Sequence, residues 1–134
     1  MFGKTEMNLR HKWSWLIGAF ALCFFAGGTM WWRGSYQDYL DSGFSWRTLL
    51  LLAGVALILS WVIGAGIVAS AVAVGSAFPA VIMARVVLDG MEDPTSHNLW
   101  PFEVAMAFGL GMITTFPSAT FGWLLRRVTR RSRA

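Results

Sequence analysis

The run of residues 48–84 decides the architecture of this chain: TLLLLAGVALILSWVIGAGIVASAVAVGSAFPAVIMA. It holds 37 consecutive residues without a charge. A single helix of that length would measure roughly 55 Å, almost twice the ~30 Å thickness of a hydrocarbon layer. Two membrane spans fit if each borrows residues from its flank, with Gly64-Ala65-Gly66 as the turn between them.

The alternative for this run is one long tilted helix that kinks near Gly75, Ser76 and Pro79 and then leaves the membrane. That model gives three spans in the whole chain, whereas the model with a turn gives four.

Two further uncharged runs, 13–32 and 104–125, are also long enough to cross a bilayer, which takes ~18–20 apolar residues. The chain of 134 residues is 56% hydrophobic and only 13% charged, more apolar surface than a soluble core of this size can bury. A membrane barrel would need stretches that alternate apolar and polar residues, and no such pattern occurs. The sequence therefore predicts an all-α integral membrane protein with a single membrane domain over 1–134.

Tryptophan placement and basic residues both favour four spans. In that model all eight tryptophans lie near an interface, where their rings are preferred, whereas three spans put Trp61 in mid-membrane. Lys and Arg concentrate before the first span and after the last, so the positive-inside rule places both termini in the cytoplasm and requires an even number of spans. We expect a bundle of four helices in a bacterial inner membrane, with the first helix a retained signal anchor, spans near 13–32, 44–63, 67–88 and 101–125, and a basic cytoplasmic tail at 126–134.

The external loop 89–103 is the segment richest in chemistry, because it holds four of the seven acidic residues. Asp93 before Pro94 predicts a capped helical turn. Pro101 followed by Glu103 predicts the start of the last span, with a carboxylate near the positive end of the helix dipole.

Three hypotheses describe this loop. As a cation site it would use four ligands whose spacing matches no established motif, Glu92, Asp93, His97 and Glu103. As a capped loop it would have only a structural role, ending one helix and starting the next. As a docking surface it would present Trp100 and Phe102 to a partner. A bound metal is the least favoured of the three.

Small residues recur at every fourth position in two spans, first at Ala65, Ala69, Ala73 and Ala77, with Ser76, Ala80 and Ala84 beside them, and then at Ala107, Gly111, Thr115 and Ala119. Small side chains let helices approach closely where lipid offers no hydrophobic drive. We expect the two stripes to pack against each other, and Ala69 and Ala73 are also the candidates for binding a partner helix.

The Phe-Pro steps at 78–79 and 116–117 are the sequence argument for transport. Each proline frees the carbonyl four residues back, and freed carbonyls at membrane depth can coordinate a cation. Against this, no ionisable residue lies near the middle of any span, where pumps and coupled transporters keep theirs.

The functional expectation is a non-catalytic accessory or assembly subunit of a membrane complex, or a small homo-oligomer. The alternative is a small oligomeric channel or carrier for a cation or small solute. Expected partners are membrane lipids and other membrane subunits or copies of the chain, and not nucleic acid. No cofactor is indicated: the single cysteine, Cys23, is expected to be a packing residue, and no nucleotide or haem motif occurs.

Overall fold

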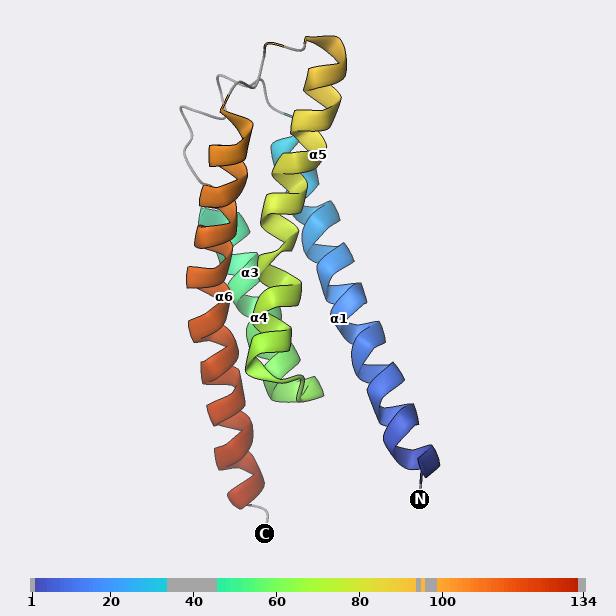
Figure 1. Ribbon diagram of the computed structural model, residues 1–134. Helices are drawn as coiled ribbons and strands as arrows, with labels where there is room; N and C mark the ends of the chain where they lie inside the picture. The colour runs from blue at the N-terminus through green and yellow to red at the C-terminus, as the bar shows by residue number, and fades with distance from the viewer. Residues whose placement is uncertain (1, 34–45, 94, 96–98, 133–134) are drawn as a thin grey trace.

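The computed structural model describes residues 2–33, 46–93, 95 and 99–132, with side chains from Arg10 onward except at position 30. Its helices are α1 (Phe2–Trp31), α3 (Trp46–Ile58), the π-helical turn η1 (Leu59–Ile63), α4 (Ile67–Gly75), α5 (Ala77–Glu92) and α6 (Trp100–Arg131). In the described residues these elements form four rods, because η1 continues α3 and α5 continues α4, and Figure 1 shows how the rods lie.

Three of the rods are long and apolar enough to cross a membrane: Trp46–Ile63, Ile67–Glu92 and Trp100–Arg131. The predicted class, an all-α integral membrane protein built as a four-helix bundle, is confirmed. That α1 also crosses the bilayer stays a prediction.

The chain reverses at Gly64–Gly66, so a single kinked helix through 48–84 is wrong. Gly64 has φ 72° and ψ 32°, the left-handed conformation that ends many helices. The amide of Ala65 donates back to the carbonyl of Leu59 at 3.2 Å, closing the turn. Across the hairpin, the buried hydroxyl of Ser60 donates to that of Ser70 at 3.2 Å. The local reason is that glycine adopts positive φ without a steric penalty.

A bend still occurs where the alternative model placed it, but within the second half of the hairpin. α4 ends at Gly75 and α5 begins at Ala77. Pro79 has no amide hydrogen, so the carbonyl of Gly75 has no helical donor four residues ahead. Helical bonding resumes with the amide of Ala80 donating to Ser76 at 3.2 Å.

α6 is the central packing element and contacts α3, α4 and α5. Its predicted small-residue stripe, with Gly122 one turn further on, is buried. At Gly111 an added Cβ would lie 2.4 Å from the carbonyl oxygen of Gly75, and at Gly122 it would lie 2.4 Å from that of Leu57. Glycine at these two crossings therefore lets the helix backbones touch, as expected for packing in lipid.

The partner stripe on α4 and α5 differs from the prediction. Ala65 and Ala77 are buried, but Ala69 is exposed and Ala73 is only half-buried. The face that meets α6 is instead the one carrying Ala71 and Gly75. The close crossing of Gly111 on the Gly75 carbonyl fixes this register. The buried Thr115 hydroxyl lies beside it, 2.8 Å from the carbonyl of Gly111 on its own helix and 3.0 Å from that of Ala71.

α1 packs on α5, α4 and α3, and Cys23 is buried in this contact region, as expected of a packing residue. α1 begins and α6 ends at the same end of the bundle (Figure 1), where the Gly64–Gly66 turn also lies; we call this the basic end. The opposite end, where α1 and α5 end and α6 begins, is the loop end.

Several helices extend past the predicted spans. α1 begins at Phe2, α5 continues to Glu92, and α6 continues through Arg131 into the segment predicted as a basic tail. A charge ends a hydrophobic run but not a helix, since Lys, Arg and Glu are good helix formers.

Candidate functional site

At the predicted docking loop, Asp93 ends α5 and its carboxylate binds Thr95, two residues further on. Its Oδ1 accepts hydrogen bonds from the amide of Thr95 at 2.9 Å and from the Thr95 hydroxyl at 2.7 Å. These two bonds, the amide first, hold the pKa of Asp93 below its ordinary value because they favour the charged form. The capping bond agrees with the sequence prediction. The rest of the predicted turn, with Pro94 and Ser96, lies outside the described residues.

The start of α6 is as predicted, with Pro101 in its first positions and Glu103 in its first turn. Of the four candidate metal ligands, Glu92 and Asp93 are exposed at the end of α5, Glu103 is half-buried on α6, and His97 is not among the described residues. Within the described parts of the chain, no three His, Cys, Asp or Glu side chains are close enough to hold a metal ion.

The four predicted partner-binding residues lie on the surface to different degrees. Trp100 is 41% exposed and Phe102 is 64% exposed at the loop end. Ala69 faces outward from α4, and Ala73 packs partly against the core. Trp100 and Phe102 both lie on the first turn of α6, where residues two apart point to different sides of the helix, while Ala69 and Ala73 lie on α4.

The two Phe-Pro steps do not face each other across the bundle. The Gly75 carbonyl lies against Gly111 at the closest crossing of α4 and α6. On α6, Pro117 is exposed and Ile113 is 72% exposed, so this step lies on the outer surface. The carbonyl that Pro79 frees is therefore covered by a neighbouring helix.

Arg85 organises the loop end. Its Nε pairs with Asp89 Oδ2 at 3.1 Å, and its Nη1 donates to the carbonyl of Trp31 at the end of α1. The indole of Trp31 donates in turn to the buried hydroxyl of Thr48 at 3.3 Å. An arginine at the C-terminus of a helix satisfies a carbonyl and complements the negative end of the dipole, so this cluster joins α1, α3 and α5.

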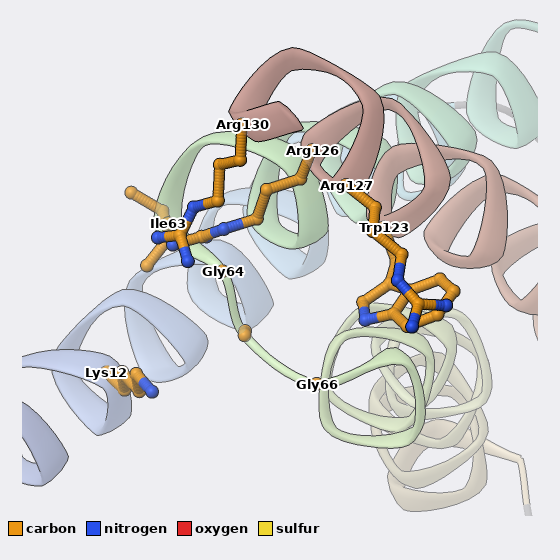
Figure 2. A pocket seen from close by; sticks show the side chains of 9 residues that line it. Lys12, Ile63, Gly64, Gly66, Trp123, Arg126, Arg127 and Arg130 are labelled. Atoms are coloured by element: carbon orange, nitrogen blue, oxygen red, sulfur yellow. The ribbon is translucent and has the colours of Figure 1, made fainter. Parts of the chain in front are cut away.

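The basic end holds a pocket of about 490 Å³ that sequence reasoning missed. Figure 2 shows its walls: the Gly64–Gly66 turn, Trp123 of α6, and cationic side chains from two helices. The cations that line it, defined here as the basic pocket residues, are Lys12 on α1 and Arg126, Arg127 and Arg130 on α6.

Two of these arginines are held in place. Arg126 extends over Gly64, where an added Cβ would collide with its guanidinium, and its Nη1 donates to the carbonyl of Trp61 at 3.5 Å. The guanidinium of Arg127 lies 4.9 Å from the centre of the Trp123 ring, in cation–π range. In Figure 2, Arg126 and Arg130 reach to the same side of the pocket, and Lys12 lies on α1.

The sequence carried one indication of this site. Arg126, Arg127 and Arg130 are spaced to share a helical face once α6 continues past Leu125. In the sequence these arginines indicate only membrane orientation, because their proximity to Lys12 and to the turn depends on tertiary packing. In comparisons with known proteins, the chain matches no protein-family model, no curated protein and no solved structure.

Proposed function

We propose that this chain is a non-catalytic membrane protein that acts through helix packing, as an accessory or assembly subunit of a membrane complex or as a small homo-oligomer. Its partner-facing surfaces are the outward face of α4 around Ala69 and Ala73, and the 89–103 loop with Trp100 and Phe102. Both termini would lie in the cytoplasm of a bacterial inner membrane, in keeping with the excess of Lys and Arg at the basic end.

The observation that carries the proposal is that the two small-residue stripes differ in burial. The α6 stripe is fully buried within the chain, whereas Ala69 stays exposed and Ala73 only half covered. Lipid packs well against large aliphatic side chains, so a small-residue face is most useful where another helix approaches closely. The exposed Val68 and Val72 lie beside Ala69 and Ala73 on this face, and a second membrane helix would approach over the two alanines.

The bundle interior supports a packing role. Among the described residues, the buried polar side chains are Thr48, Ser60, Ser70 and Thr115, and none is charged. Each has a hydrogen-bond partner inside the chain. Hydroxyls that have hydrogen-bond partners stabilise helix contacts in lipid. The charged side chains of the described residues lie at the ends and on the outer faces of the bundle, where a partner could reach them.

Ala69→Leu and Ala73→Leu test the α4 surface, with Ala105→Leu as the matched control on an exposed position of α6. We expect the first two to reduce the native mass measured after mild detergent extraction, because a close helix contact cannot absorb the added volume. Ala105→Leu should leave the mass unchanged. Copurifying subunits support the accessory role and a single-chain oligomer supports self-association. A wild-type monomer, or three variants that behave alike, would contradict the proposal.

Trp100→Ala and Asp93→Asn test the loop. For a docking loop we expect Trp100→Ala to weaken assembly and Asp93→Asn to be tolerated, since asparagine keeps the acceptor oxygen for Thr95. The reverse order, together with metal bound to the wild-type protein, would favour a cation site. Ion conductance of the reconstituted oligomer would favour the channel alternative.

A further inference from the structure

We propose that the basic pocket is a binding site for a phosphate group, presented by the headgroup of an anionic phospholipid at the membrane surface. This site lies at the basic end, and lipid binding there does not depend on which partner the protein assembles with.

The first support is convergent charge, with no counter-charge among the side chains that the structure describes. Four cations from α1 and α6 line one pocket. Among the side chains that the structure describes, the ion pair is Arg85–Asp89 at the loop end, and no carboxylate pairs with the basic pocket residues. Like charges brought together at a partly desolvated site repel one another, and an anion in the pocket would relieve that repulsion.

The second support comes from the backbone. The N-terminus of α4 opens on the pocket at Gly66, and no side chain caps it. The first amides of a helix have no partner within the helix and form the positive end of its dipole. Guanidinium groups and uncapped amides are the donors that proteins use for phosphate.

The third support is the size and depth of the site. A volume of about 490 Å³ falls in the ~300–1,000 Å³ range of ligand pockets. Trp123 forms one wall, and tryptophan prefers the headgroup level of a bilayer. Basic pockets between membrane helices on the cytoplasmic side are suited to anionic headgroups.

The test compares two neighbouring arginines on the last turns of α6. Both are exposed, but Arg130 lines the pocket and Arg131 does not. The full-length protein in neutral detergent is titrated with phosphatidylglycerol, with phosphatidylcholine or with inorganic phosphate, and stabilisation is followed as the melting midpoint. Arg130→Gln removes a pocket charge, and Arg131→Gln removes an equal charge beside it.

We expect phosphatidylglycerol, and not phosphatidylcholine, to stabilise the wild type. Arg130→Gln should raise the half-saturating lipid concentration about fivefold, which corresponds to ~1 kcal/mol for one charge, and Arg131→Gln less than about twofold. Without added lipid, Arg130→Gln should be at least as stable as the wild type, because it removes a repulsive charge.

A second pair of variants tests whether the site spans two helices. Lys12→Gln on α1 should weaken binding as Arg130→Gln does, whereas Arg10→Gln, on the same helix but outside the pocket, should not. If inorganic phosphate reproduces the stabilisation with the same order of variants, the site takes a phosphate group from water. Equal effects of Arg130→Gln and Arg131→Gln, or no stabilisation of the wild type by either phosphate source, would overturn the proposal.

Discussion

Arg85 at the loop end and Arg126 at the basic end perform the same structural task in different electrostatic settings. Each donates to a carbonyl near the C-terminus of a neighbouring helix, Arg85 to Trp31 and Arg126 to Trp61. Arg85 is also paired with Asp89, one turn away on its own helix. Arg126 is accompanied instead by two further arginines and a lysine.

The difference in charged neighbours between Arg85 and Arg126 indicates a different role for each end of the bundle. At the loop end the chain supplies both charges, so the cluster is complete within the fold and stabilises it. At the basic end the charged side chains that line the pocket are all cationic, and the lipid headgroup proposed above would supply the balancing charge. A charge imbalance near a membrane surface is a basis for orientation and for lipid binding.

Substitution at Gly64 should break the basic end most severely. Gly64 has positive φ, and an added Cβ would meet the Arg126 guanidinium. We expect Gly64→Val to lower the free energy of unfolding by about 2 kcal/mol, because a branched residue is strained in the left-handed region. Gly66→Val is the control, since Gly66 has ordinary φ and open space around its Cα. Unfolding in mixed micelles measures both, and equal losses would show that the turn conformation is not decisive.

The two arginines themselves should respond unequally in neutral detergent. Arg85→Met removes the ion pair with Asp89 and the hydrogen bond to the Trp31 carbonyl, and we expect a loss of about 1–3 kcal/mol. Arg126→Met loses a long hydrogen bond but relieves repulsion from Arg130, so its loss should stay under about 1 kcal/mol. Thermal melting of the two variants checks this order. A larger loss for Arg126→Met would contradict the distinction between a complete and an incomplete cluster.

The smallest effect should be a pH dependence at Asp93. Its folded-state pKa is lowered by the bonds from Thr95, so the ordering it provides is present above the unfolded pKa and is lost as the pH falls through the lowered folded value. In the wild type, we expect the protection of the Thr95 amide against hydrogen exchange to decrease as the pH is lowered. Asp93→Asn should remove that pH dependence while keeping the cap. Identical pH profiles in the two proteins would show that the carboxylate does not cap this turn.

The sequence by itself determined the class of the fold and the break in its longest apolar run. The 48–84 run is too long for one span, because the thickness of a bilayer limits the length of a span. The Gly64–Gly66 turn is also a local property, because glycine adopts the positive φ that the turn requires. Local patterns also account for three further features: the capping bond of Asp93 to Thr95, the start of α6, and the buried stripe of small residues on α6.

Only the tertiary structure decided which face of α4 packs inward and which charges meet. α4 is built almost entirely of small and aliphatic residues, so Ala69 and Ala71 are equivalent in pattern. The close crossing of Gly75 with Gly111 on α6 selects the Ala71 face. Lys12, Gly64 and Arg126 are far apart in the sequence, and no periodicity relates them. They form one pocket because the turn, α1 and the extended end of α6 all lie at the same end of the bundle.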